Sequence, residues 1–148
     1  MSHNELVERT LSLDDYEAIM DLWQRAGRTS IRPQGRDSRA AFARQLASGV
    51  QHIIGLEDGG RLVVAIVATH DGRKGWLNRL AVAPAYRGQG LARRLIAAAE
   101  QWLASQDILV WAVLIEEDNE PSLRLFQSAG YVLAPDILYL SKRPSAAA

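Results

Sequence analysis

Residues 80–95 read LAVAPAYRGQGLARRL, and they are the most informative run in this chain of 148 residues. An apolar stretch typical of a β-strand ends at Pro84, and a turn containing Gly88 and Gly90 follows it. After Gly90, apolar side chains recur at the spacing of an amphipathic helix. The run therefore predicts a strand, a glycine turn and a helix in direct succession.

The glycine turn has the features of an anion-binding site. Gly88 and Gly90 carry no side chain that would shield the backbone amides from a ligand. The first turn of a helix has N–H groups without partners and a positive dipole end, and Arg87, Arg93 and Arg94 add full charges nearby. These features predict binding of a phosphate or pyrophosphate. On this run alone, an ordinary strand-to-helix turn with solubilising arginines remains an alternative.

Two familiar phosphate-binding motifs are excluded. A P-loop requires Gly-Lys followed by Ser or Thr, but the lysines of this chain are Lys74 and Lys142, far from the turn. A dinucleotide-binding fingerprint requires a third Gly or Ala three residues after the second Gly, and Arg93 occupies that position. The remaining pattern is Arg87-x-x-Gly90-x-Ala92. It resembles the acyl-CoA pyrophosphate loop of the GNAT N-acetyltransferase superfamily.

Residues 113–131 carry a second resemblance to the same family. Asn119 is a plausible helix N-cap, Pro121 suits the first helical turn, and Gly130 suits the left-handed position after the helix. A well-capped surface helix would explain this pattern by itself. It also resembles the GNAT signature of an Asn, a helix ending in Leu-Tyr/Phe, and a Gly followed by an aromatic residue. The two matches occur in the family's order.

The GNAT resemblance implies a fold, a cofactor and a reaction. The implied fold class is α/β (mixed α+β), with a mixed, mostly antiparallel central sheet and helices on both faces. The implied reaction is direct attack of a primary amine on the thioester of acetyl-CoA (coenzyme A), in which the amine belongs to a small molecule, an amino acid or a peptide. The residues that the resemblance assigns to the cofactor are Leu80, Ala81, Val82, Arg87, Gly88, Gln89, Gly90, Leu91, Ala92, Arg93, Asn119 and Phe126.

Candidate catalytic residues follow the strand predicted after the long helix. Glu116 is the first choice as general base and Glu117 the second, while acidic residues ahead of a helix also act simply as dipole partners. Asp118 and His70 are weaker candidates. Phe126 stands where many family members have a tyrosine that protonates the departing thiolate. A non-catalytic acyl-CoA-binding or regulatory domain is therefore the alternative function, and an interaction domain without a nucleotide is a third.

The acceptor is expected to meet the loop over residues 25–39, which contains five arginines. Arg28 and Arg32 are the candidates to bind the acceptor, and such guanidinium groups would suit a carboxylate or phosphate on it. Arginine used only for solubility is the alternative. We therefore predict an amine acceptor that is anionic.

Composition limits the other possibilities. Apolar residues make up 48% of the chain, charged residues 23%, and the formal net charge is zero, as in an ordinary globular domain. The neutral charge gives no reason to expect nucleic acid as a partner, and no run is apolar enough to suggest a membrane span. The chain has no cysteine, which excludes disulfides, thiolate metal sites and a cysteine nucleophile. No metal is expected.

The expected organisation is a single domain over residues 1–143 with a frayed tail at residues 144–148. The N-terminal residues lack the regions of a signal peptide, so a cytoplasmic monomer or homodimer is expected. Helices are expected to begin at Ser12 and at Asp37 or Ser38. The expected strands cover residues 5–11, 51–57, 62–69, 76–82, 108–115 and 131–140.

Overall fold

The computed structural model describes residues 5–28 and 30–148, so the signal-peptide argument on residues 1–4 lies outside the described part. The strands are β1 (Leu6–Leu11), β2 (Gln51–Asp58), β3 (Arg61–His70), β4 (Gly75–Val82) and β5 (Trp111–Val113). The helices are α1 (Tyr16–Arg25), α2 (Arg39–Ala47), α3 (Leu91–Ser105) and α4 (Glu120–Ser128), with short 3-10 turns η2 (Leu13–Asp15) and η3 (Pro84–Tyr86).

The five strands form one sheet in the order β1-β2-β3-β4-β5. The pairs β1-β2, β2-β3 and β3-β4 are antiparallel, and β5 runs parallel to β4. Short turns connect β2 to β3 and β3 to β4, whereas α1 and α2 lie between β1 and β2, and the parallel pair needs α3 as its crossover. This is the mostly antiparallel mixed sheet that the sequence predicts.

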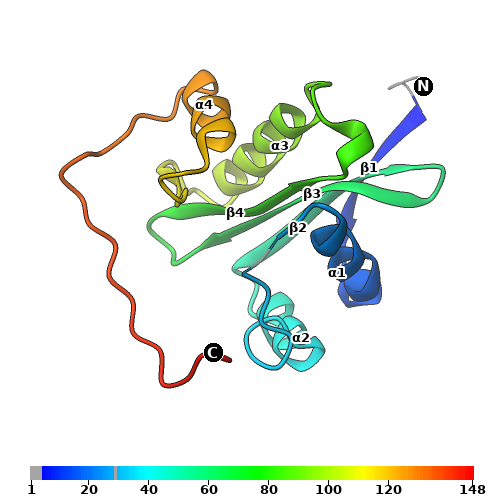
Figure 1. Ribbon diagram of the computed structural model, residues 1–148, viewed down its shortest axis with the longest axis horizontal. Helices are drawn as coiled ribbons and strands as arrows, with labels where there is room; N and C mark the ends of the chain where they lie inside the picture. The colour runs from blue at the N-terminus through cyan, green and yellow to red at the C-terminus, as the bar shows by residue number, and fades with distance from the viewer. Residues whose placement is uncertain (1–4, 29) are drawn as a thin grey trace.

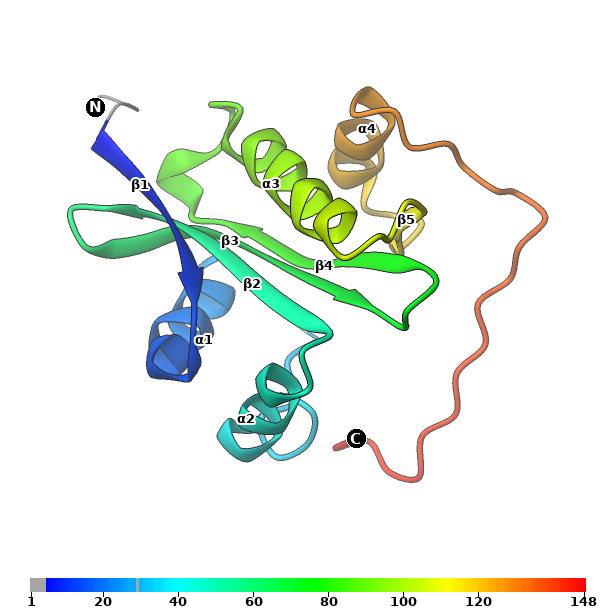
Figure 2. The same ribbon diagram turned by 180° about the vertical axis from the view of Figure 1, so that it is seen from behind.

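Helices cover both faces of the sheet. Figures 1 and 2 show α1 and α2 on one side and α3 and α4 on the other. The strand β3 lies at the centre, and seven of its ten residues, from Leu62 to Ala68, are buried. Because both faces of β3 are covered, its sequence is a continuous apolar run rather than an alternating one. The predicted α/β fold is confirmed.

Local sequence signals set the helix starts. Ser12 and Asp15 form the predicted capping box, in which the Ser12 N–H donates to the Asp15 carboxylate at 2.8 Å. The Ser38 hydroxyl accepts from the Ala41 N–H at 3.1 Å, so Ser38 is the N-cap of α2. Within the described residues, no helix combines the length and apolarity needed to cross a membrane.

Two irregularities open the sheet beside β4. The register of β3 with β4 shifts between Ala65 and Val67, and Arg79 adopts a φ of 52° at this bulge. On its other side, β4 pairs with β5 only as far as the pair of Leu77 and Val113. Beyond Leu77, the edge of β4 is therefore open on the β5 side.

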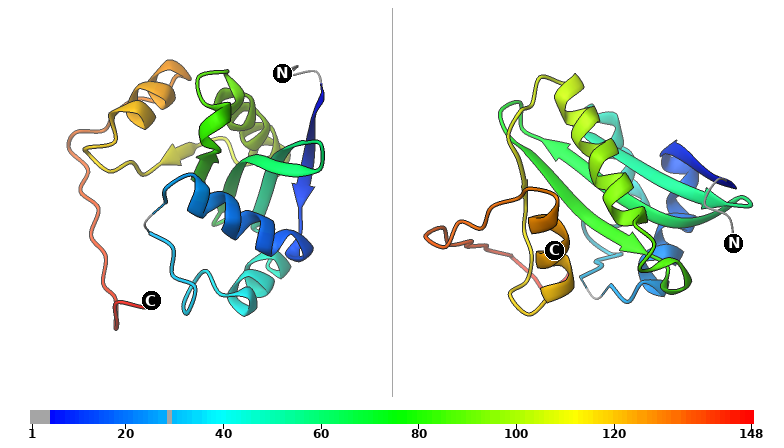
Figure 3. Two further views of the ribbon diagram at one scale, coloured as in Figure 1. Left: turned by 45° about the vertical axis from the view of Figure 1, so that its right-hand side comes forward. Right: turned by 90° about the horizontal axis from the view of Figure 1, so that it is seen from above.

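The two last predicted strands differ from the structure. The strand expected over residues 108–115 is reduced to β5, and the strand expected over residues 131–140 is wrong. Val132 and Leu138 are 91% and 83% exposed, and the segment runs away from the sheet as an extended chain (Figure 3). A strand needs a neighbour that offers hydrogen bonds. The three-residue β5 offers few, and Pro135 has no N–H to contribute.

Candidate active site

A cavity of about 1270 Å³ lies where β4 opens. Its walls come from β4, the glycine turn, the start of α3, the residues after β5, α4, and the connection between α1 and α2. This volume is above the range of about 300–1,000 Å³ that is usual for small-molecule sites, so the cavity has room for a large ligand. All twelve residues that the sequence assigns to the cofactor line this one cavity.

The glycine turn leads into a helix N-terminus that has no side-chain cap. Gly88 and Gly90 have φ values of 75° and 77°, a left-handed conformation that glycine adopts without strain. Gly90 is the N-cap of α3 and offers no side-chain cap, and the first intrahelical bond runs from the Arg94 N–H to the Gly90 carbonyl. The first turn of α3, at residues 91–93, precedes this bond, and N–H groups of a first helical turn have no partner within the helix and can bind an anion. A Cβ on either glycine would meet no heavy atom within 4 Å, so the space beside the turn is open.

The backbone of β4 faces the same cavity. The Ala83 N–H donates to the Val63 carbonyl on the β3 side, at 2.8 Å. Because peptide groups alternate along a strand, those of Leu80 and Val82 point toward the open edge. The Arg28 guanidinium donates to the Leu80 carbonyl at 2.6 Å. The Arg87 Nε donates to the Val82 carbonyl at 3.4 Å. The open edge thus presents main-chain groups to the cavity, and two of its carbonyls already accept from arginines.

The arginines near the turn have different surroundings. The Arg87 guanidinium donates to the carbonyl of Ala26, at the end of α1, at 3.1 Å. Arg93 reaches the Ser128 hydroxyl on α4 at 3.3 Å and lines the cavity. Arg94 points elsewhere, because its guanidinium lies 3.7 Å from the Glu8 carboxylate on β1. Of these three arginines near the turn, Arg87 and Arg93 line the cavity and Arg94 does not.

The two predicted catalytic carboxylates differ in position. Glu116 lies beyond β5 and lines the cavity, whereas its neighbour Glu117 is not among the lining residues. The charge of Glu116 also acts on Arg28, another residue that lines the cavity. His70 is the last residue of β3, and its Nδ1 accepts from the Gly72 N–H of the following turn at 3.0 Å. Of the acidic candidates Glu116, Glu117 and Asp118, Glu116 alone lines the cavity.

The helix α4 contributes Asn119 and Phe126. The Asn119 side chain accepts from the Ser122 N–H at 3.3 Å and caps the helix. Phe126 is buried and packs edge-on against Tyr131, with ring centroids 5.2 Å apart. The Tyr131 hydroxyl donates to Glu100 at 2.7 Å, and burial together with this bond raises the pKa of Tyr131. Tyr131 therefore serves the packing of α4 on α3.

The far end of the cavity holds charged residues that the sequence did not single out. Arg36, Asp37 and Arg79 line it together with Arg28. The Arg79 guanidinium donates to the Asp37 carboxylate at 2.9 Å and lies 4.7 Å from the centroid of the Trp23 ring. Since Asp37 and Arg79 are far apart in sequence, no local signal pairs them.

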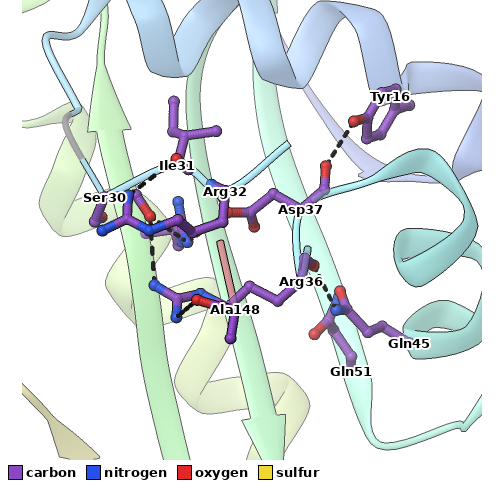
Figure 4. A network of polar contacts seen from close by, with 10 residues as sticks. Tyr16, Ser30, Ile31, Arg32, Arg36, Asp37, Gln45, Gln51 and Ala148 are labelled. Atoms are coloured by element: carbon purple, nitrogen blue, oxygen red, sulfur yellow. Dashed lines mark hydrogen bonds and ion pairs between the residues drawn. The ribbon is translucent and has the colours of Figure 1, made fainter. Parts of the chain in front are cut away.

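Arg32, predicted to bind the acceptor, is not among the residues that line the cavity. Its backbone N–H donates to the Asp37 carboxylate at 2.7 Å, and its side chain reaches the Ile31 carbonyl at 3.1 Å. Arg36 occupies the neighbouring position, where it donates to the carbonyls of Ser30 and Ala148 (Figure 4). Arg36 is thus the arginine of this connection that accompanies Arg28 at the cavity.

Burial and mutual repulsion act on these arginines. Burial lowers the pKa of Arg28, and the charge of Arg79 lowers it further, while Glu116 opposes the shift. Burial also lowers the pKa of Arg79, and Asp37 opposes that shift. Positive charge is therefore held close together at this end of the cavity, at an electrostatic cost. Across residues 5–28 and 30–148, no three His, Asp or Glu side chains lie close enough to hold a metal ion.

Comparisons with known proteins agree with this geometry. Residues 16–131 match the model of the acetyltransferase (GNAT) family. The chain is 28% identical over 135 residues to the acetyltransferase SG1711 of Sodalis glossinidius (strain morsitans), covering 91% of this chain and 93% of that protein.

Two solved structures share the fold. One is AAC(6')-Iy in complex with a bisubstrate analogue, CoA-S-monomethyl-acetylneamine, with a TM-score of 0.77, 19% identity, and coverage of 96% of this chain and 99% of the other. The second is a predicted acetyltransferase with acetyl-CoA from Clostridium acetobutylicum, with a TM-score of 0.77, 16% identity, and coverage of 92% and 96%.

Proposed function

The chain belongs to the acetyltransferase (GNAT) family and is an N-acetyltransferase that uses acetyl-CoA, and from that premise we propose that it acetylates a primary amine carried by a small molecule, an amino acid or a peptide. The observation that carries the proposal is the meeting of the open α3 N-terminus and the open β4 edge in one cavity. The turn of residues 87–92 would hold the pyrophosphate through backbone amides. The edge at Leu80 and Val82 would hold the pantetheine arm. Asn119 and Phe126 would complete the wall on α4.

Glu116 is proposed as the general base of the reaction. An amine with an ordinary pKa of about 10.4 must lose a proton before it attacks, which costs about 4.6 kcal/mol at pH 7. Acetyl-CoA supplies the acetyl group, whose carbon–sulfur bond is replaced by a bond to the amine nitrogen. Glu116 would take the amine proton, directly or through water, and Glu117 would be its substitute.

Phe126 leaves no hydroxyl at the position from which many family members protonate the thiolate. A thiol has an ordinary pKa near 8.5, so the thiolate is a tolerable leaving group without an acid. Phe126 would instead pack against the pantetheine arm. The proposal also keeps the single domain over residues 1–143, the cytoplasmic location, and the monomeric or homodimeric state expected from the sequence.

Thermal melting tests the cofactor site. Acetyl-CoA and CoA should each raise the melting temperature, and a ligand at 100 times its Kd stabilises a fold by about 2.7 kcal/mol. NADP should give no comparable shift. The Gly90→Glu variant should lose the shift, because a carboxylate would stand beside the amides of α3.

Gly49→Glu is the matched control. Gly49 has a φ of 78°, close to the 77° of Gly90, and equally open surroundings, but it does not line the cavity. Both variants carry the same backbone strain, so only the loss of the CoA shift distinguishes them. An unchanged shift in Gly90→Glu would contradict the assignment of the turn to the pyrophosphate.

A further inference from the structure

The cavity collects positive charge in a chain that has none overall. The formal net charge of the protein is zero. Five arginines line the cavity, against two carboxylates. Arg87 and Arg93, beside the glycine turn, match the phosphates of the cofactor. The other arginines, Arg28, Arg36 and Arg79, line its far end, so the cofactor does not account for them.

Arg79 is compensated within the protein. Its guanidinium pairs with the Asp37 carboxylate at 2.9 Å, and both side chains are largely buried, with 14% and 7% of their surfaces exposed. The Asp37 carboxylate also accepts from the Arg32 N–H at 2.7 Å. Asp37 is therefore committed to structural partners.

Arg28 and Arg36 have no such side-chain partner. The ion pairs formed within residues 5–28 and 30–148 give neither arginine an Asp or Glu partner within 4.0 Å. Arg28 donates to the Leu80 carbonyl, and Arg36 donates to the Ser30 carbonyl and to an oxygen of Ala148, the last residue of the printed sequence. The peptide carbonyls of Leu80 and Ser30 satisfy N–H groups but do not neutralise a charge. Each guanidinium also has more donors than these bonds use.

The surroundings of the two arginines are polar. Gln45, Gln51 and Asn78 line the same end of the cavity, and the Asn78 amide donates to the Thr69 hydroxyl at 3.1 Å. Gln45 and Gln51 lie beside the backbone of Arg36, whose carbonyl accepts from the Gln45 amide at 2.8 Å, while the Arg36 guanidinium points away from them (Figure 4). Amide groups both donate and accept hydrogen bonds. This end is therefore equipped for a polar ligand that bears an anionic group.

We propose that the acceptor is an amine that also carries a carboxylate, and that Arg28 and Arg36 select it by binding that carboxylate. The inference rests on the proposed function and specifies its acceptor. Guanidinium groups bind planar carboxylates through paired hydrogen bonds. Glu116, which lines the same cavity, is then left for the ammonium end of the same molecule. One acceptor would thus place its two charged ends against residues of opposite charge.

The proposal separates this chain from fold relatives that act on polycations. AAC(6')-Iy is bound to an analogue that contains neamine, an aminoglycoside with several amino groups. Such a molecule is strongly cationic at neutral pH, and the positive charges of Arg28 and Arg36 would repel it. The shared fold therefore does not transfer the acceptor class.

Pairs of amines with and without a carboxylate test whether the enzyme selects for that group. Release of CoA from acetyl-CoA is measured with γ-aminobutyrate against butylamine, with L-phenylalanine against phenethylamine, and with neamine. O-phosphoethanolamine against ethanolamine shows whether a phosphate serves instead. We expect kcat/KM to be at least tenfold higher for the carboxylated member of a pair, and neamine to be among the poorest acceptors. Equal rates within both carboxylate pairs would overturn the proposal. A preference for neamine or for O-phosphoethanolamine over the carboxylated amines would overturn it as well.

Variants of the two arginines test whether these residues produce the preference for carboxylated amines. Arg36→Gln should reduce the preference for the carboxylated amine at least tenfold, mainly through KM, while the thermal shift with CoA is kept. Arg28→Lys keeps the charge and should keep part of the preference. Arg124→Gln is the control for a lost charge, because Arg124 is exposed on α4 and pairs with Glu120 outside the cavity. A preference that survives in Arg36→Gln and Arg28→Gln alike would contradict the role of both arginines.

A binding measurement separates the two proposals. If CoA gives no thermal shift to the wild-type protein, the cofactor site itself is wrong. If CoA binds but no amine of the panel is acetylated, the melting temperature of the CoA complex is measured with each pair. Further stabilisation by the carboxylated members alone supports the acceptor proposal. Equal stabilisation by both members, or none by either, would overturn it.

Discussion

The Arg28 guanidinium holds the carbonyl oxygen of Leu80 at 2.6 Å. This bond ties the connection between α1 and α2 to the open edge of β4, just beyond the Arg79 bulge. The acceptor end of the cavity and the strand that faces the cofactor are therefore joined by one side chain. A change at Arg28 should affect both.

Arg28→Met should lower the free energy of unfolding by about 1.5–3 kcal/mol, the usual value of a hydrogen bond from a charged group. It should also lower kcat/KM for acetyl transfer at least tenfold. Arg25→Met is the control, because Arg25 makes a similar bond to the Leu62 carbonyl at 2.8 Å and does not line the cavity. Urea unfolding and initial rates measure the two effects. Equal loss of activity in both variants would show that only stability is involved.

Glu116→Gln should lower kcat/KM by about 10²–10⁴-fold if Glu116 is the base. The deficit should shrink as the pH rises, because more of the amine is then already neutral. Glu117→Gln removes the same charge from the next residue, which does not line the cavity, and should retain most of the activity. A pH profile of kcat/KM for both variants is the measurement. Similar losses at the two positions would contradict the assignment.

Breaking the buried pair of Asp37 and Arg79 should cost about 3–5 kcal/mol of unfolding free energy in either single variant, Asp37→Leu or Arg79→Met. The double variant should lose less than the sum of the two, because neither charge is then left alone. The same cycle at Glu120 and Arg124, whose side chains are 74% and 68% exposed, should give less than about 1 kcal/mol. Chemical denaturation measures all of these variants, and strictly additive losses at the buried pair would count against the coupling.

Stability should fall as the pH is lowered through the range in which His52 titrates. Burial lowers the pKa of His52 below its ordinary value of 6.5, and the ring stacks on Trp102 at 4.7 Å. The unfolded chain therefore takes up this proton at a higher pH than the folded chain, so acid favours unfolding. His52→Gln should flatten the dependence of the urea midpoint on pH below about 6.5. Parallel curves for the variant and the wild type would exclude His52 as a cause.

The sequence predicted those parts of the site whose signals are local. Gly90 needed a left-handed conformation at the start of α3, and its position after a strand was enough to place the turn of residues 87–92. The capping box of Ser12 and Asp15 likewise depends on residues three positions apart. Such features follow from backbone geometry over a single turn.

The sequence could not predict features that depend on distant segments. Asp37 and Arg79 meet because a loop and a strand bulge come together in the folded chain, and neither residue carries a pattern that points to the other. The apolar residues over 131–140 satisfied the pattern of a strand, but a strand also requires a partner edge. Here β5 is only three residues long, so the pattern was not sufficient.

The left-handed glycines at the start of α3 have a consequence for how new specificities can be obtained from this scaffold. The amides at that end of the cavity belong to the backbone. Side-chain substitutions at the other end therefore leave the binding of the acetyl-CoA phosphates unchanged. Side chains shape the opposite end, among them Arg36 and Asn78. A library confined to those two positions, which spares Arg28 and its bond to the Leu80 carbonyl, would vary the amine while the donor stays constant. One assay of thiol release would screen all of its members without background from protein thiols, since the protein has no cysteine.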